Sequence, residues 1–370
     1  MERFAHYGWP FFEPRHEKLA REAEAWATQN LAHAHGEDAD GICRRLVQDL
    51  GCAGYLSYSA TETPDVRSIA LLREVFAYHA GLADFAFVMQ GLGSGAIGLA
   101  GTAAQKEKYL AKAARGEAIA AFALSEPDAG SDVQAISTRA RKQGAGWVLD
   151  GTKTWISNGG IADFYVTFAR AEEGISAFVV EAKDVDASER IDIVAPHPMA
   201  VIRLKDSAGT LLGEIGQGFK LAMRNLDVFR TTVAAAALGF ARRALDEALA
   251  RARERGMFGQ KLADFQLTQA KLARMAVTIQ GARQFAYAVA RMMAKGQGMI
   301  EAAMVKAYVC RAAEWVTREA MQIHGGYGYA EEYAVSRYFV DARVLSIFEG
   351  ADETLALKVI ARRLVERAAR

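Results

Sequence analysis

Helical spacing of apolar residues marks the first and last thirds of this chain. In the first third, stretches rich in Ala, Leu, Glu, Arg and Lys at residues 17–32 and 105–114 predict helices, and Gly and Ser clusters separate them. From residue 219 onward, long Ala-rich amphipathic segments return at residues 231–255, 265–295 and 301–322. Their lengths and spacing are typical of a helical bundle.

The middle of the chain has a different pattern. Turn residues separate short β-rich runs at intervals of about ten positions, and these runs lie at residues 119–124, 146–149, 164–169 and 176–180. This pattern predicts a small antiparallel sandwich or barrel. We therefore expect an α+β fold of three domains: a helical N-terminal domain (1–115), a β domain (116–225) and a C-terminal domain resembling a four-helix bundle (226–370).

Length and charge change this picture only slightly. At 370 residues the chain exceeds the size at which a single core keeps growing, which agrees with several domains. Lys plus Arg (45) balances Asp plus Glu (44), so the chain lacks the excess of positive charge that indicates binding to nucleic acid or to an anionic membrane. We expect neither of these partners, and local residues must meet any charged ligand.

Cysteine usage and apolar runs indicate the compartment. Cys43, Cys52 and Cys310 show neither the spacing of a metal site nor an even disulfide framework, so we expect buried thiols, a reducing compartment and no metal. The residues after Met1 lack the basic and apolar regions of a signal peptide, and no uncharged apolar run is long enough to span a bilayer. The expected location is the cytoplasm.

Two polar turns that contain glycine are the strongest candidates for a binding site. Residues 123–132 (ALSEPDAGSD) and 154–160 (TWISNGG) each follow an apolar run and combine small side chains, hydroxyls and backbone N–H groups with an indole. Such turns allow a large flat polar ligand to lie close to the chain. A pair of ordinary hairpin turns is the alternative, and the two turns together favour a cofactor cradle.

A third glycine-rich stretch has a formal match to a dinucleotide fingerprint. Residues 91–96 (GLGSGA) fit G-x-G-x-x-G/A and follow an apolar run. No βαβ pattern surrounds the match, and no acidic residue ends a second strand about 20 residues later. We therefore expect a loop between packed helices here.

Near the carboxyl end, Glu349 lies between Phe348 and Gly350. Desolvation by apolar neighbours raises the pKa of a carboxyl group towards neutrality, which suits a general base, whereas a helix N-terminal acid is the alternative. Two further segments, residues 255–259 leading to Gln266 and residues 322–328, combine an arginine with glycine-rich backbone. These are the groups that bind a pyrophosphate.

Five separated motifs together resemble the acyl-CoA dehydrogenase family over nearly the whole chain. They are GTAAQKEKYL at residues 101–110, LSEPDAGSD at 124–132, WISN at 155–158, LDVFR at 226–230, and Glu349 at the position where most members carry the catalytic glutamate. In this family FAD lies between the β domain and the carboxyl-terminal helices.

The resemblance assigns specific positions to FAD. Backbone of residues 122–125 and the Ser125 hydroxyl hold the pyrimidine edge of the flavin, Ser157 lies near N5, and Trp155 covers the ring, where it also has a packing role in the sheet. The positions assigned to the cofactor are Phe122, Leu124, Ser125, Gly130, Ser131, Trp155, Ile156, Ser157, Arg255, Phe258, Gln266, Gln322, Gly325, Gly326, Ala351 and Glu353.

The resemblance also implies the chemistry and the partners. Glu349 removes the α-proton of an acyl-CoA thioester, flavin N5 accepts the β-hydride, and an electron-transfer flavoprotein takes the electrons. The thioester carbonyl is held by the Glu349 N–H and a ribityl hydroxyl of the cofactor. The substrate positions are Ser131, Asp227, Phe229, Arg230 and Gly350. A homotetramer, built as a dimer of dimers, also follows from the resemblance.

Departures from the family pattern leave details open. Some relatives carry the base immediately before the arginine that Arg230 matches; here that residue is Phe229, so Glu349 is the remaining candidate, and Phe229 favours a short or compact acyl group. Asp128 replaces the usual glycine, and Ala351 replaces a threonine that contacts FAD. Residues 55–62 lack the expected Gly-Gly loop, so acyl chain length and branching stay undetermined.

Three other functions remain open from the sequence. A flavin-dependent monooxygenase on the same scaffold usually lacks the base, so Glu349 argues against it. A dehydrogenase of acyl groups held by a carrier protein shares every motif above. A noncatalytic acyl-binding or partner-binding protein is expected to show a broken cradle and no bound flavin.

Overall fold

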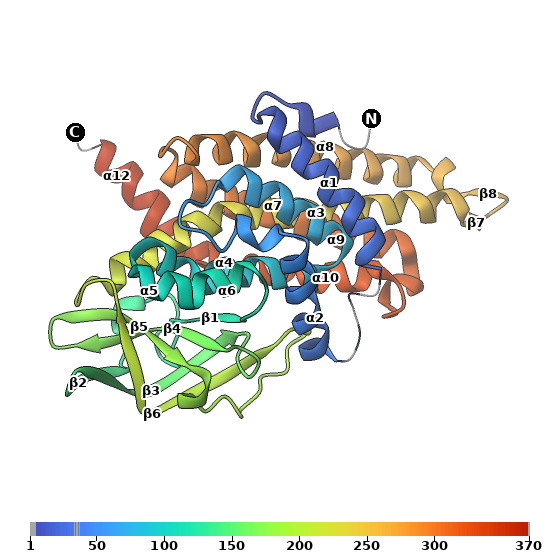
Figure 1. Cartoon of the computed structure of the whole chain (residues 1–370). Helices are drawn as coiled ribbons and strands as arrows, with labels where there is room; N and C mark the ends of the chain where they lie inside the picture. The colour runs from blue at the N-terminus through green and yellow to red at the C-terminus, as the bar shows by residue number, and fades with distance from the viewer. Residues whose placement is uncertain (1–4, 33, 35, 37, 369–370) are drawn as a thin grey trace. The chain divides into compact units, whose positions relative to one another are not determined.

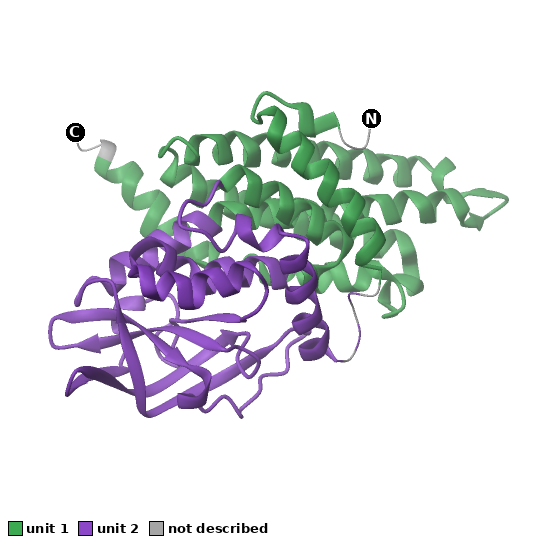
Figure 2. Ribbon diagram, viewed as in Figure 1, with its two compact units in different colours: residues 1–32, 66–84, 230–370 green, residues 33–65, 85–229 purple. Residues whose placement is uncertain are grey.

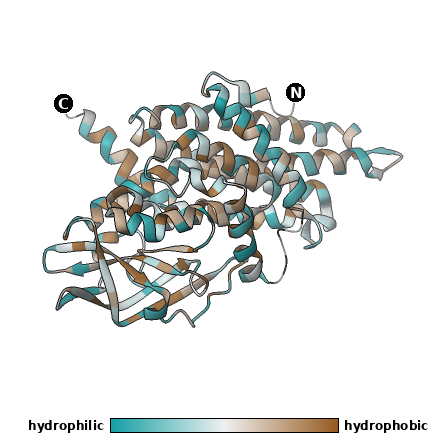
Figure 3. Ribbon diagram, viewed as in Figure 1, coloured by the Kyte–Doolittle hydropathy of each residue, from teal (hydrophilic) through white to brown (hydrophobic). Residues whose placement is uncertain are grey.

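The computed structural model describes residues 5–32, 34, 36 and 38–368. These residues form two compact units, one made of residues 1–32, 66–84 and 230–370 and the other of residues 33–65 and 85–229 (Figure 2). Each unit is assembled from segments that are distant in the sequence. Apolar and polar residues are both present along the helices and strands of each unit (Figure 3).

The first unit is helical (Figure 1). Long helices at the positions expected from periodicity make up most of it, joined by short turns and by one small hairpin. Its elements are η1 Ala5–Gly8, α1 Pro14–Asn30, α3 Val66–His79, most of α7 Gly218–Glu254, β7 Gly256–Met257, β8 Gln260–Lys261, η6 Leu262–Asp264, α8 Gln266–Met293, α9 Met299–His324, η7 Gly325–Tyr329, α10 Ala334–Val344, α11 Asp352–Thr354, a π-helical stretch Leu355–Ala361, and α12 Arg362–Ala368.

The second unit combines helices with the β structure. Its helical elements are α2 Ala39–Cys52, η2 Tyr55–Tyr58, most of α4 Gly81–Ala100, α5 Ala103–Gln105, a π-helical stretch Lys106–Leu110, α6 Ala111–Ala114, η4 Val133–Ala135 and η5 Ala182–Asp184. Its strands are β1 Ala120–Ala123, β2 Arg139–Gln143, β3 Gly146–Ser157, β4 Phe164–Ala171, β5 Gly174–Glu181 and β6 Met199–Leu212. Strands β1, β3, β4 and β5 lie where the sequence predicts them, whereas β2 and β6 were not expected.

The strands form one closed sheet. They run in the order β1-β4-β2-β3-β6-β5, and an additional pairing of β5 with β4 closes a barrel of five strands with β1 on its edge. Most pairings are antiparallel, as expected, but β1 and β2 each pair with β4 in parallel. Inside the closed sheet, the small core consists of Ala140, Leu149, Ala169, Phe178, Val180 and Leu204.

Helix α4 corrects one expectation from the sequence. Residues 91–96 form neither a loop nor a nucleotide turn, because α4 runs through them without interruption. A Cβ on Gly91 would lie 2.7 Å from the Phe229 ring and from Ser59, and one on Gly95 would lie 2.2 Å from the Asn225 side chain. The glycines therefore allow neighbouring side chains to pack against the helix.

Helix α4 is also long and apolar enough to cross a membrane when judged by length and composition alone. The mean hydropathy of its most apolar part reaches 1.3, and 83% of that part is buried. From the sequence we expected no uncharged apolar run of spanning length, and this helix contains the charged residue Asp84. Helices in the core of folded domains pass the same test, and the burial of α4 matches that case.

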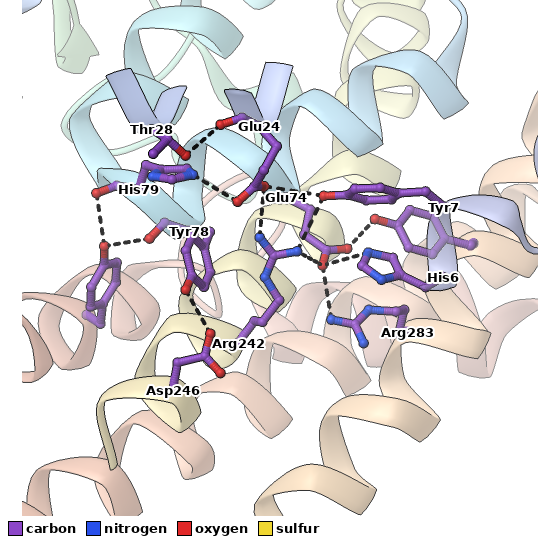
Figure 4. A network of polar contacts seen from close by, with 12 residues as sticks. His6, Tyr7, Glu24, Thr28, Glu74, Tyr78, His79, Arg242, Asp246 and Arg283 are labelled. Carbon is purple, nitrogen blue, oxygen red and sulfur yellow. Dashed lines mark hydrogen bonds and ion pairs between the residues drawn. The ribbon is translucent and has the colours of Figure 1, made fainter. Parts of the chain in front are cut away.

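A buried polar network joins five elements of the helical unit (Figure 4). At its centre the Glu74 carboxylate of α3 accepts hydrogen bonds from Arg242 of α7, and from Arg283 and Tyr287 of α8. His6 of η1 lies 3.4 Å from the same carboxylate. Glu24 of α1 pairs with Arg242 at 3.2 Å and with His79 at 3.1 Å. The network fixes the N-terminal segment and α1 against the bundle.

Candidate active site

Glu349 lies in the loop between α10 and α11, three residues before α11 begins. It is therefore not the helix N-terminal acid that the sequence left as an alternative. Both Glu349 (φ 50°) and Gly350 (φ 97°) have left-handed backbone conformations. For a non-glycine residue such a conformation costs about 1–3 kcal/mol and persists only where the surroundings enforce it.

Two cationic side chains, half-buried Arg230 and fully buried Lys306, hold this loop by its backbone. The Nε of Arg230 donates a hydrogen bond to the carbonyl oxygen of Glu349 at 3.1 Å, and the Nζ of Lys306 donates to the carbonyl oxygen of Gly350 at 2.7 Å. The N–H of Asp352 closes the loop by donating to the carbonyl of Ser346 at 3.2 Å. These contacts enforce the two left-handed residues.

One carboxylate oxygen of Glu349 is left without a partner. Its Oε2 is buried and has no hydrogen-bond partner among the described residues. Burial raises the pKa of Glu349 above its ordinary value, even though the positive charges of Arg73, Lys306 and Arg230 act to lower it. A buried carboxylate with a raised pKa is suited to accept a proton.

The nearby cations are bound to other acceptors. Arg73, which is only 1% exposed, donates from Nε and Nη2 to both carboxylate oxygens of Asp84 at 2.8 Å, and from Nη1 to the Thr232 hydroxyl at 3.2 Å. Arg230 and Lys306 bind backbone carbonyls, as described above. The hydrogen bonds of these three side chains named here run to Asp84, to Thr232 and to two backbone carbonyls.

In the second unit, the first polar turn is held by a buried ion pair. Lys153 of β3 has no exposed surface, and its Nζ donates to Glu126 Oε1 at 2.8 Å and to the carbonyl of Leu124 at 3.0 Å. Glu126 also accepts the backbone N–H groups of Ser137 at 2.5 Å and Thr138 at 3.0 Å. Although burial opposes the shift, the hydrogen bonds from Lys153 and Thr138 lower the pKa of Glu126 to about 2.

The two polar turns lie side by side. The N–H of Thr154 donates to the carbonyl of Ser125 at 3.0 Å, which joins the turn after β1 to strand β3. This contact brings Ser125 next to the residue before Trp155. The other predicted positions of the two turns are Phe122 in β1, Leu124, Gly130 and Ser131 in the first turn, and Ile156 and Ser157 at the end of β3.

A β-bulge sets the position of Trp155. The register between β3 and β6 shifts between Lys153 and Ile156, so Thr154 and Trp155 together oppose one residue of β6. Trp155 has φ 57° and a 60% exposed side chain, in contrast to buried Ile156 beside it. An exposed indole held by a strained backbone fits a role in stacking on a flat ring.

The remaining predicted cofactor positions lie in the helical unit. A Cβ on Gly325 would lie 3.5 Å from Arg255 Nη1, so the arginine and the glycine-rich segment are adjacent. Phe258 (φ 49°) and Gly259 (φ 80°) form the two-residue tip of the β7–β8 hairpin, where Phe258 is 88% exposed. Gln266 begins α8, Gln322 lies near the end of α9, Gly326 follows Gly325, and Ala351 and Glu353 flank Asp352.

The predicted substrate positions are divided between the units. Asp227 and Phe229 lie on α7 in the second unit, where Phe229 is 1% exposed and packs against Gly91. Arg230 and Gly350 lie in the helical unit, where Arg230 binds the backbone of Glu349. The structure therefore shows one contact for Arg230 that the sequence did not suggest.

Sequence reasoning missed Glu126, Lys153, Arg73 and Lys306. Glu126 lies within the first polar turn, and Lys153 directly precedes the second. A lysine inside a β-rich run is an unusual residue type for a buried position. Arg73 and Lys306 lie in largely apolar stretches of α3 and α9, and a charge within such a stretch is the signal that could have found them. Their partners depend on tertiary structure and leave no local pattern.

Three family models match this chain in order. Residues 13–117 match the N-terminal domain, residues 121–205 the middle domain and residues 216–365 the C-terminal domain of acyl-CoA dehydrogenase. The chain belongs to the acyl-CoA dehydrogenase family. This finding confirms the family and the fold class expected from the sequence. It also confirms the enzyme class, an oxidoreductase that acts on CH–CH groups, and FAD as the cofactor.

Known relatives of this acyl-CoA dehydrogenase also support its assignment to the family. It is 38% identical over 310 residues to the short-chain specific acyl-CoA dehydrogenase of Megasphaera elsdenii, covering 80% of this chain and 81% of the relative. It is 38% identical over 281 residues to the 3-(aryl)acrylate reductase of Clostridium sporogenes, covering 72% and 74%.

Solved structures are similar as well. One is described as the electron transferring flavoprotein of Acidaminococcus fermentans, with a TM-score of 0.87, 33% identity and coverage of 95% of this chain and 98% of that chain. Another is an acyl-CoA dehydrogenase complexed with FAD from Bacillus anthracis, with a TM-score of 0.89, 30% identity and coverage of 97% and 68%.

Proposed function

We propose that this acyl-CoA dehydrogenase converts an acyl-CoA thioester to the 2-enoyl-CoA, with Glu349 as the base that removes the α-proton. The observation that carries the proposal is the buried, unpartnered Oε2 of Glu349, whose pKa is raised by burial. When bound, FAD supplies the acceptor for the β-hydride. A compact acyl group is favoured, because Phe229 fills the space beside Gly91.

The backbone beside the base suits the developing charge. The N–H of Glu349 donates to no backbone carbonyl within the part of the chain that the structure describes. It is thus available to the thioester oxygen, where a fixed donor lowers the cost of the negative charge that forms as the α-proton leaves. Arg230 orients this peptide by holding its carbonyl, and Asp227, Ser131 and Gly350 are the further positions proposed for substrate.

The residues of the two polar turns fit a flavin. Trp155 offers an exposed ring face, the residues from Phe122 to Ser125 supply backbone groups for the pyrimidine edge, and Ser157 supplies a hydroxyl. Arg255 beside Gly325 suits the diphosphate. The other positions proposed for the cofactor are Leu124, Gly130, Ser131, Ile156, Phe258, Gln266, Gln322, Gly326, Ala351 and Glu353.

We also propose the assembly around the enzyme. An electron-transfer flavoprotein is the electron acceptor, which the likeness to a chain from the A. fermentans flavoprotein structure supports. A homotetramer, a cytoplasmic location and the domain boundaries 1–115, 116–225 and 226–370 belong to the same proposal.

Anaerobic flavin reduction by a panel of acyl thioesters tests the function. We expect CoA thioesters of short or compact acyl groups to bleach the flavin, and Glu349→Gln to keep FAD while the reduction rate falls by a factor on the order of 10² to 10⁴. The control, Glu314→Gln, removes a partly exposed carboxylate that pairs with Arg343 at 3.5 Å, and it should bleach like the wild type.

Three results would overturn the proposal. A Glu349→Gln enzyme that reduces its flavin at nearly the wild-type rate contradicts the assignment of the base. Bleaching only by acyl groups on a carrier protein contradicts CoA as the handle. Rapid consumption of oxygen by the reduced enzyme with incorporation into the product points to the monooxygenase instead.

A further inference from the structure

Lys306 is a buried cation for which no role has been assigned so far. It lies on α9 with no exposed surface, and its Nζ donates to the carbonyl oxygen of Gly350 at 2.7 Å. The nearest carboxylate oxygen, Oδ1 of Asp352, is 4.0 Å away. Asp352 is instead bound through its other oxygen by Arg311, at 2.7 Å.

This arrangement is costly for the fold. An ammonium group taken out of water loses several kcal/mol of hydration, which a close carboxylate usually offsets. Lys306 Nζ contacts a backbone carbonyl oxygen, and the nearest carboxylate oxygen lies 4.0 Å away, at the largest distance that counts as an ion pair. An apolar side chain at this position avoids the cost, so the cation serves a purpose other than stability.

The carbonyl that Lys306 holds belongs to the residue after the base. Arg230 holds the carbonyl of Glu349 and Lys306 holds the next carbonyl, so two adjacent peptides with left-handed residues are both fixed by cations. We propose that Lys306 is a positioning residue for Glu349, fixing the loop so that Oε2 of the carboxylate stays buried and unpartnered. This inference rests on the proposed function.

Charges on several elements face the base. Arg73 of α3, Lys306 of α9 and Arg230 of α7 favour its ionised form, whereas Asp84 of α4 disfavours it. Arg73 is neutralised by Asp84, and Arg230 is held on the Glu349 carbonyl. Removal of Lys306 therefore takes away a charge that no other buried cation replaces.

The test measures flavin reduction by acyl-CoA in the FAD-loaded enzyme as a function of pH. In Lys306→Met we expect the rate at pH 7 to fall about 10- to 100-fold through misplacement of the base. The rate should rise with pH around a midpoint about one unit higher than in the wild type, because a nearby positive charge has gone. In Lys306→Gln, the amide can still donate to the Gly350 carbonyl, so the rate above the midpoint recovers while the midpoint stays shifted.

A surface lysine provides the control. Lys271→Met removes a 40% exposed ammonium group that pairs with Glu319 at 2.7 Å, and we expect neither the rate nor the midpoint to change. If Lys306→Met keeps the wild-type rate and midpoint while Glu349→Gln is slow, the role of Lys306 is overturned and the proposed function stands. A fast Glu349→Gln enzyme overturns the proposed function itself. Where Lys306→Met does not fold, the midpoint of Lys306→Gln decides, since an unshifted midpoint contradicts the proposal.

Discussion

Glu74 and Glu349 both belong to the helical unit and both have carboxylate oxygens removed from solvent, but their pKa values shift in opposite directions. Although burial acts to raise the pKa of Glu74, the charges of Arg283, His6 and Arg242 hold it well below its ordinary value. Burial raises the pKa of Glu349 despite three cations nearby. The proximity of positive charge therefore does not decide the outcome.

The difference lies in where the cations donate. Arg242 and Arg283 direct their N–H groups to the Glu74 oxygens themselves (Figure 4). The hydroxyl of Tyr287 donates to the same carboxylate. The cations around Glu349 donate to Asp84 and to backbone carbonyls, so they tune its charge without occupying its oxygens. A satisfied carboxylate stabilises a fold, whereas an unsatisfied one is available for proton transfer.

The largest effect on stability is expected at Glu74. Glu74→Gln removes the carboxylate that pairs with buried Arg283 and one of the two carboxylates that pair with Arg242, which should lower the free energy of unfolding by about 3–5 kcal/mol. Thermal or urea unfolding measures this loss. The control Glu17→Gln removes a carboxylate from an exposed i,i+4 pair with Arg21 and should change stability by less than about 1 kcal/mol. Equal effects in the two variants contradict the role given to the network.

The contrast between the two carboxylates also shows what a sequence can reveal. Periodicity alone predicts the long helices and four strands, because those elements bury one face along a regular pattern. Glu349 was predicted through its apolar neighbours and its resemblance to the family position. The contacts of Arg230, Lys306 and Arg73 join residues more than ten positions apart, and no local pattern encodes them.

Two misses have the same cause. Residues 91–96 look like a loop because glycine is a weak helix former, but close neighbours such as Phe229 require the small residues within α4. Strand β2 was missed because its burial pattern is mostly exposed, so alternation is absent. In both cases tertiary packing overrides the local preference.

Glu126 offers a second case of a fully bonded carboxylate. Its pKa of about 2 lies below the unfolded value near 4.5, so its stabilising contribution is complete above about pH 4.5 and is lost as the pH falls towards 2. Relative to Glu126→Gln, the wild type should lose about 2–3 kcal/mol of unfolding free energy over this range. Unfolding by urea at a series of pH values measures the difference. A difference that is constant with pH contradicts the bonded, ionised state of Glu126.

A smaller shift should move Glu349 towards the behaviour of Glu74. Asp84→Asn removes the charge that neutralises Arg73 and that disfavours ionisation of Glu349. The pKa of Glu349 should fall, and the midpoint of the rate against pH should move down by about one unit. Asp246→Asn is the control, since Asp246 is another partly buried carboxylate of the helical unit and accepts a hydrogen bond from the Tyr78 hydroxyl at 2.7 Å. An upward shift in Asp84→Asn contradicts the account of the cations.

The availability of the Glu349 carboxylate is tested by the anaerobic rate of flavin reduction by a reactive acyl-CoA from pH 5 to pH 9. We predict that the wild-type rate rises with pH around a midpoint above 4.5, the ordinary value for a glutamate. Glu349→Gln should be slower by at least about a hundredfold across the range. A midpoint at or below 4.5, or a Glu349→Gln enzyme that follows the wild-type profile, would show that Glu349 is not a buried base with a raised pKa.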